Sequence, residues 1–198
     1  MHRQITKQNY TIEEKKALAK TIKELYPKKQ DAIVTQQVAA LRTDVIEAAL
    51  LHKKCWYVSC GGSAANTFQL ALGDKLPRRQ AIPNRVYHDE FDNFEGEANL
   101  LVWCSWRLDS SSGPLSSSDD MSEHVLPALK ALIGREIADV RIDLPGWDLH
   151  LTFSEDRVLH VFCDHVPGDP SFDGNWDLTL PDRIIGIGVG SKWEEEMR

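Results

Sequence analysis

The sequence has little of what marks several classes of protein. No apolar run approaches the roughly 20 residues that a helix needs to cross a bilayer, and the first ten residues lack the apolar core of a signal peptide. We therefore expect a cytoplasmic protein with no membrane partner. Cysteine is scarce, and Cys55, Cys60, Cys104 and Cys163 do not have the CxxC spacing of a zinc or redox site. In a reducing compartment they are expected to be small, buried hydrophobic residues.

Complete nucleotide-binding and catalytic motifs are missing as well. Gly61, Gly62 and Ser63 form a turn signal outside a P-loop motif. Gly186, Gly188 and Gly190 resemble part of a dinucleotide loop, but they come too late in the chain for a βαβ unit to follow. They are expected to allow a bent edge strand or the close approach of another backbone. No nucleophile elbow occurs, so the sequence favours a binding protein without a cofactor over an enzyme.

Charge is distributed unevenly along the 198 residues, whose formal net charge is −7. Residues 1–54 hold eleven Lys/Arg against six Asp/Glu, which is +5, whereas residues 55–198 hold twelve against twenty-four, which is −12. An acidic body disfavours nucleic acid as a partner, because phosphate binding needs a concentrated basic face. The same charge suits a basic protein partner, and it also keeps a domain soluble.

Residues 1–54 are predicted to form a helical hairpin appendage. Thr11 and Glu14 have the spacing of a capping box, and the first helix is expected to end before Pro27. Asp31 can cap a second helix, in which apolar residues recur at a spacing of three and four: Val34, Val38, Leu41 and Val45. This stripe packs either on the domain's own core or on a second copy, which would give a homodimer through residues 32–51.

Residues 55–198 are predicted to form an antiparallel α+β domain. The runs 55–60 and 66–73 suggest a hairpin, and 98–108 is apolar enough for a single strand buried on both faces. The serine-rich stretch 109–118 is expected to be a linker-like loop before a helix that Asp120 and Glu123 cap and Gly134 ends. The expected fold is a strongly curved antiparallel sheet with the 120–133 helix packed on it.

One later hairpin permits a prediction of register. Leu149, Leu151 and Phe153 alternate with polar residues, as do Leu159, Val161 and Cys163. A two-residue turn would pair Leu151 with His160 and mix the two faces, so we expect a three-residue connection that pairs Leu151 with Val161 and Phe153 with Leu159. The length of the connection decides which residues share a face. The three-residue connection places four residues together on the second face: His150, Thr152, His160 and Phe162.

An acidic segment is the first candidate site. Five carboxylates lie between positions 89 and 97, and their spacing does not match an EF-hand loop. The plainer interpretation is a solvated acidic loop. If function is binding, however, this segment offers negative charge together with aromatic anchors for a basic partner. The predicted partner-binding residues are His88, Asp89, Glu90, Phe91, Asp92, Phe94, Glu95 and Glu97.

Histidines provide the alternative site. His150, His160 and His165, with Asp148 and Asp164 nearby, are the only arrangement in the sequence that resembles a metal or acid–base centre. No helix holds two of them at one pitch, and histidines on the wetter face of a sheet explain the pattern with fewer assumptions. The alternative function is a metal-assisted hydrolase or a small-ligand-binding protein that uses the His150/His160 face.

The body also has a recognisable series of core and turn motifs. Residues 134–153 contain GxxIxxVxIxxPGWDLxLxF, and an LxVF run, an NWxLxxPD run and a final GxGxGS follow. Over residues 55–193 this series resembles small bacterial proteins of unassigned function, some of which are similar to immunity proteins that neutralise secreted toxins. The resemblance implies an immunity protein acting on a basic toxin, but it lies in positions that carry fold, so no functional residue is transferred.

Overall fold

The computed structural model describes residues 27–61, 67–79, 90–168 and 174–198. The chain divides into two compact units, Met1–Val45 and Ile46–Arg198, which are considered separately. In the first unit the described part belongs to helix α2 (Pro27–Leu50), whose last turn enters the second unit. The first helix of the predicted hairpin lies outside the described residues, so the hairpin remains a prediction. Within the described ranges no helix combines the length and the apolar character needed to cross a bilayer.

Helix α2 starts earlier than the sequence suggests. Pro27 is its first residue, a position where proline is tolerated because its missing amide would have no partner there. The predicted apolar stripe is not the face that packs on the core. Its members Val38, Leu41 and Val45 are exposed, whereas Ile46 and Leu50, which the prediction did not include, are fully buried in the core of the second unit.

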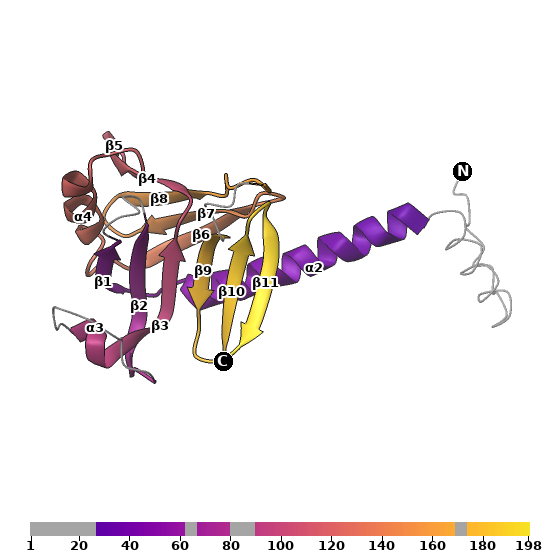
Figure 1. Ribbon diagram of the computed structural model, residues 1–198, viewed down its shortest axis with the longest axis horizontal. Coiled ribbons are helices and arrows are strands. Elements are labelled where there is room, and N and C mark those ends of the chain that lie inside the picture. Colours follow the sequence, from indigo (N-terminus) through magenta and orange to yellow (C-terminus); the bar gives the residue numbers. More distant parts are fainter. Residues whose placement is uncertain (1–26, 62–66, 80–89, 169–173) are drawn as a thin grey trace, which may run out of the picture. The chain divides into compact units, whose positions relative to one another are not determined.

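The second unit is built on two antiparallel sheets, where the sequence had suggested one curved sheet. The six-stranded sheet has the order β1-β2-β3-β9-β10-β11 (Figure 1). Its strands are β1 (Cys55–Cys60), β2 (Phe68–Pro77), β3 (Phe94–Val102), β9 (Gly174–Thr179), β10 (Arg183–Gly188) and β11 (Lys192–Met197). The mixed α+β class and the antiparallel pairing are confirmed.

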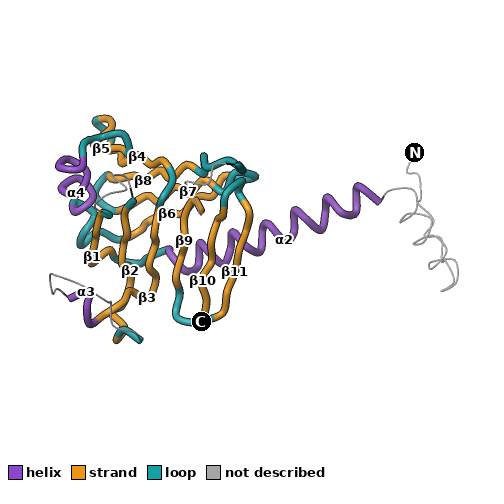
Figure 2. Tube along the Cα trace, in the orientation of Figure 1, coloured by secondary structure: helices purple, strands orange, loops and turns teal. Residues whose placement is uncertain are grey.

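The five-stranded sheet has the order β5-β4-β8-β7-β6, and its strands run across those of the six-stranded sheet (Figure 2). These strands are β4 (Ser105–Ser110), β5 (Gly113–Ser117), β6 (Ile137–Asp143), β7 (Asp148–Phe153) and β8 (Arg157–Phe162). Two helices complete the unit. The short α3 (Glu90–Asn93) precedes β3, and α4 (Ser122–Lys130) contacts the edge strands β1 and β5.

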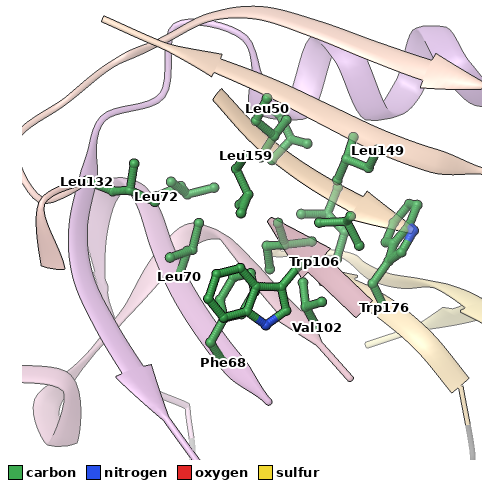
Figure 3. Packing of buried hydrophobic residues seen from close by; sticks show 14 of the residues in the cluster. Leu50, Phe68, Leu70, Leu72, Val102, Trp106, Leu132, Leu149, Leu159 and Trp176 are labelled. Atoms are coloured by element: carbon green, nitrogen blue, oxygen red, sulfur yellow. The ribbon is translucent and has the colours of Figure 1, made fainter. Parts of the chain in front are cut away.

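The core lies between the two sheets. Phe68 of β2 meets Trp106 of β4 edge-on, with ring centroids 5.2 Å apart (Figure 3). The indole Nε1 of Trp176 donates a hydrogen bond to the carbonyl of Trp147 over 3.1 Å, so this buried aromatic ring also has a polar partner. Leu50 from α2 reaches the same cluster (Figure 3). The apolar side chains that alternate along the strands therefore form the inner faces of a two-sheet sandwich.

The strand predicted over 98–108 is in fact two strands in different sheets. β3 ends at Val102 and β4 begins at Ser105. Between them the amides of Trp103 and Cys104 both donate to the carbonyl of Asn175, over 2.9 and 3.2 Å. The whole run is apolar because both strands contribute buried residues, β3 in the six-stranded sheet and β4 in the five-stranded sheet. Hydrophobicity alone does not mark the corner that separates the halves.

The serine-rich segment is an ordered hairpin and not a linker-like loop. Gly113–Ser117 forms β5 against β4, and the carboxylate of Asp156 accepts hydrogen bonds from both the amide and the hydroxyl of Ser111. Helix α4 follows where the sequence predicts it, but the predicted cap is wrong. Met121 is the N-cap residue, and Asp120 instead accepts from the Ser116 hydroxyl and the Ser117 amide, each over 2.9 Å.

The β7–β8 hairpin has the expected three-residue connection and faces, but its register is different. Leu151 pairs with Leu159 and Phe153 with Arg157, two residues away from the prediction. Glu155 and Asp156 both adopt positive φ, at 56° and 64°, which tightens the connection. A shift of two residues leaves every side chain on its face, because the side-chain period of a strand is two.

Candidate functional site

Two histidines face each other at the centre of the five-stranded sheet, on the side opposite the core. His150 of β7 and His160 of β8 are direct cross-strand partners, and their Nδ1 atoms are 2.7 Å apart. Both side chains are largely shielded from solvent, with exposed fractions of 11% and 20%. Phe162 covers them from one side, because its ring stacks on His160 and meets His150 edge-on.

An aspartate and an arginine extend this pair on each side. Nε2 of His150 is 3.0 Å from the Asp143 carboxylate, which also pairs with Arg141 of β6. Nε2 of His160 is 3.2 Å from the Asp109 carboxylate, which Arg107 of β4 holds with two nitrogens. The resulting histidine network crosses four strands: Arg107, Asp109, His160, His150, Asp143 and Arg141.

The contacts of the histidine network determine where its protons lie. A carboxylate only accepts hydrogen bonds, so the Nε2 atoms of His150 and His160 are both donors. The Nδ1 atoms can form their short hydrogen bond only if one of them is protonated and the other is not. Three protons on four nitrogens satisfy every contact, and the pair then carries a single positive charge.

A second positive charge on this pair is unfavourable. Burial lowers the pKa of His160, and His150 lowers it further, while the Asp109 carboxylate acts in the opposite direction. Arg107 and Arg141 also lower this pKa. The sheet thus holds a proton-sharing histidine pair that resists full protonation.

The three histidines predicted as alternative metal ligands are not gathered in one place. His165 follows β8, where its Nδ1 lies 2.7 Å from the Gly174 carbonyl and its amide donates to Asn175 Oδ1. Asp148 and Asp164 are also engaged, since Asp148 accepts from the Cys163 amide and Asp164 from the Ser105 hydroxyl. Among the residues that the structure describes, no group of three or more His, Cys, Asp or Glu side chains is arranged to hold a metal ion.

The acidic segment 88–97 is largely occupied by contacts within the fold. Glu90 pairs with Lys75 and Glu97 with Lys53, each at 2.5 Å. Glu95 is buried and pairs with Arg198 at 3.2 Å. His88 and Asp89 lie outside the described residues. Part of the negative charge of this segment is therefore already neutralised by basic side chains.

The aromatic residues of this segment do not stand out as surface anchors. Phe91 is only 5% exposed, and its ring stacks on Tyr57 with centroids 4.4 Å apart. The guanidinium of Arg78 lies over the other side of that ring, at 4.2 Å. Phe94 and Asp92 are half-buried. Phe91 thus serves mainly to pack α3 on β1.

A second acidic site, which the sequence did not suggest, lies on the outer face of the six-stranded sheet. Gly186 of β10 is paired with Asp177 on one side and Glu194 on the other. A Cβ at Gly186 would lie 2.7 Å from Asp177 Oδ1, and one at Gly188 would lie 2.6 Å from Glu194 Oε1. The carboxylates thus occupy the space that the glycines leave open. We refer to Asp177, Gly186, Gly188 and Glu194 as the acidic row.

Asp177 in the acidic row is harder to ionise than an ordinary aspartate. Burial raises the pKa of Asp177 to about 6, and the nearby Glu194 carboxylate contributes to the same shift. Sequence reasoning missed this pair because Asp177 and Glu194 become neighbours only when β9, β10 and β11 are aligned. Alternation in NWDLT places Asp177 opposite the core, but that signal does not identify its neighbour.

Comparisons of the chain with protein-family models, with curated proteins and with solved structures found no match.

Proposed function

We propose that the protein is a non-enzymatic, cytoplasmic binding protein whose acidic body binds a basic protein partner. Immunity proteins, which the sequence resembles, neutralise toxins, and a basic bacterial toxin is the class of partner that we propose. The observation that supports binding of a cation most directly is that Asp177 and Glu194 flank Gly186 on one face of the sheet. Burial raises the pKa of Asp177 and the Glu194 carboxylate adds to the shift, so a lysine or arginine placed between the two carboxylates would stabilise their ionised forms.

Strand β11 makes the acidic row accessible to a partner. It is the edge strand of the six-stranded sheet, and Glu194, Glu195 and Glu196 are exposed along it. Glu194 and Glu196 alternate with Glu195, so they lie on the same face as Asp177. Charge of one sign along an edge strand also speeds the encounter with a partner of opposite charge.

The segment 88–97 is retained as a second proposed surface. Glu90 is exposed, and its ion pair with Lys75 is of the surface kind that contributes little to stability. A basic partner can therefore compete for Glu90 at small cost. Glu95 and Glu97 are less suited to this role, since each is tied to a basic residue from a distant part of the chain.

Co-purification with the intact protein from its native host, followed by mass spectrometry, would test the proposal. The affinity of the identified partner would then be measured for the wild type and for a D177N/E194Q variant. We expect the double substitution to weaken binding by about tenfold or more, as for a close interfacial charge pair. The matched control E123Q/D139N removes two exposed carboxylates elsewhere and should weaken binding much less.

Two outcomes would contradict this assignment. If the partner is not basic, complementary charge does not explain recognition. If D177N/E194Q binds as tightly as E123Q/D139N, the acidic row is not the interface, and E90Q/D92N would test the 88–97 segment in the same assay.

The histidine network supports a second candidate function, binding of a metal ion or small ligand, with metal-assisted hydrolysis as its catalytic form. Asp143 and Asp109 orient His150 and His160 through their Nε2 atoms, as outer carboxylates orient metal-binding histidines. The two Nδ1 atoms face each other over 2.7 Å, and a metal ion bound by both would replace the proton that they share. Elemental analysis and titration with Zn²⁺ would test this function, with H150A/H160A as the control. Zn²⁺ binding that the control retains, or no binding at all, would refute it.

We also propose that residues 32–51 form a homodimer contact. Val38, Leu41 and Val45 are exposed on α2 at the spacing of one helical stripe. Pairing this stripe with that of a second copy would remove its apolar surface from water.

A further inference from the structure

Two cysteines far apart in the sequence lie just beyond the paired ends of two strands of the five-stranded sheet. The last pair between β4 and β8 is Ser105 with Phe162, and the residue before β4 and the residue after β8 are both cysteines, Cys104 and Cys163. Their amides bond elsewhere, to the Asn175 carbonyl and to the Asp148 carboxylate. Residues directly opposite each other on antiparallel strands have Cα atoms about 4.5–5.5 Å apart. That separation is within the range that a disulfide spans.

The two thiols are close enough to interact. Both cysteines are free thiols, and the Cys163 side chain has the largest influence on the Cys104 thiol. This influence, together with burial, raises the pKa of Cys104 far above the ordinary value of a thiol. The thiol of Cys163 also donates a hydrogen bond to the Trp147 carbonyl over 3.3 Å. The two thiols are thus neighbours in the folded protein.

We propose that Cys104 and Cys163 are a redox site that forms a reversible disulfide when a peroxide oxidises the protein. Cys163 reacts first, because it is half-buried whereas Cys104 is only 1% exposed. Its thiolate attacks one oxygen of hydrogen peroxide, the O–O bond breaks, and the products are Cys163 sulfenic acid and one water after proton transfer. The Cys104 sulfur then attacks the Cys163 sulfur, the S–O bond breaks, and a second water leaves with the Cys104 proton.

This sequence of steps is balanced. Two thiols lose two electrons and two protons, and one peroxide is reduced to two waters. A small dithiol reverses the reaction by thiol–disulfide exchange. The other two cysteines are not placed for this chemistry. Cys55 and Cys60 are the two end residues of β1, and an extended strand keeps such ends about 16 Å apart, too far for a disulfide between them.

The disulfide would act on the corner between the sheets. Cys104 belongs to the short link in which the chain leaves β3 for β4, and Asn175 holds that link through its carbonyl. Asn175 is itself fully buried and donates to the Gly188 carbonyl. Cross-linking Cys104 to Cys163 would tie this corner covalently to the end of β8. Oxidation should therefore stabilise the region in which both sheets meet.

Peptide mapping of the full chain tests the proposal. The native protein is treated with hydrogen peroxide, remaining thiols are alkylated, and the digest is analysed without reductant. We expect a cross-linked peptide that joins Cys104 to Cys163, a fall from four free thiols to two, and full recovery with dithiothreitol. The midpoint of thermal unfolding, Tm, should rise by roughly 5–15 °C in the oxidised protein.

Variants distinguish the cysteine that reacts with peroxide from the cysteine that resolves the sulfenic acid. In C104A, Cys163 sulfenic acid has no resolving thiol, so labelling of Cys163 with dimedone should increase at least severalfold. C163S should keep its three thiols under the same treatment, and C60S should form the cross-link as the wild type does. The proposal is wrong if the wild type accumulates Cys163 sulfinic acid without a cross-link, or if the link connects Cys60. Because the peptide map uses the wild type alone, a variant that fails to fold leaves the test intact.

Discussion

The Nδ1 atoms of His150 and His160 lie 2.7 Å apart, and the Nε2 atom of each ring contacts an aspartate carboxylate. One proton between the rings completes the Nδ1–Nδ1 hydrogen bond. A further proton would remove its acceptor and place two cations side by side, and His150 accordingly contributes to the lowered pKa of His160.

The first prediction concerns stability in mild acid. Burial and His150 lower the pKa of His160 in the folded chain below its ordinary value of 6.5. Between these values the unfolded chain binds more protons at this residue, so the contribution of His160 to stability is lost as the pH drops from 6.5 toward the folded pKa. NMR titration of the imidazole signals together with urea unfolding at several pH values would measure this. In H160N the loss of stability below pH 6.5 should be smaller, and an unchanged loss would contradict the coupling.

The second prediction is that Asp177→Asn stabilises the protein at neutral pH. The pKa of Asp177 rises from 3.8 to about 6 on folding, so ionisation of this carboxyl opposes folding progressively as the pH rises between those values. After allowance for solvent screening, the gain at pH 7 should be about 1 kcal/mol. Urea unfolding at pH 4 and pH 7 would measure it. D139N, which changes an exposed aspartate, should not show this difference between the two pH values.

A third prediction concerns Arg198, which is joined to buried Glu95 and to the Leu180 carbonyl. Arg198→Ala should leave the Glu95 carboxylate buried without its cation and lower the free energy of unfolding by about 1–3 kcal/mol. Adding E95Q should recover part of this loss, because the uncompensated charge is then removed. R183A breaks ion pairs with exposed carboxylates and should change stability much less. Chemical unfolding that ranks R183A as the more damaging change would reject this account.

The fourth prediction tests the proposed homodimer. Leu41 is 66% exposed and central to the stripe on α2, so L41E should place two charges in the proposed contact and dissociate it. Light scattering at tens of micromolar should return a dimer for the wild type and a monomer for L41E. Q36E adds the same charge on the opposite side of the helix and should remain dimeric. A wild type that is strictly monomeric at these concentrations would end this hypothesis.

Local patterns were enough to predict several elements. The β1–β2 hairpin lies where the sequence places it, and α4 follows the expected apolar stripe. The common face of His150 and His160 was also predicted, since a strand alternates with a period of two. The predictions were wrong where one sequence pattern is compatible with two different structures. A serine-rich stretch can be a linker or an edge strand, and a long apolar run can be one strand or two.

The candidate sites were less accessible to prediction. Phe91 looked like an exposed anchor beside acidic residues, but its ring packs between Tyr57 and Arg78, which come from other parts of the chain. Asp177 and Glu194 carried no signal as a pair, because β10 separates them. Cys104 and Cys163 looked like isolated buried thiols, and only the β4–β8 register makes them neighbours.

By itself, the sequence determined the α+β class, the antiparallel pairing and the sides of β7 and β8 that face the core, because these follow from local alternation of apolar and polar residues. Tertiary structure alone decided that the chain changes sheet between Val102 and Ser105. It also decided which charges, histidines and thiols meet across strands. Such contacts depend on strand order and register, and these are set by the packing of the whole core.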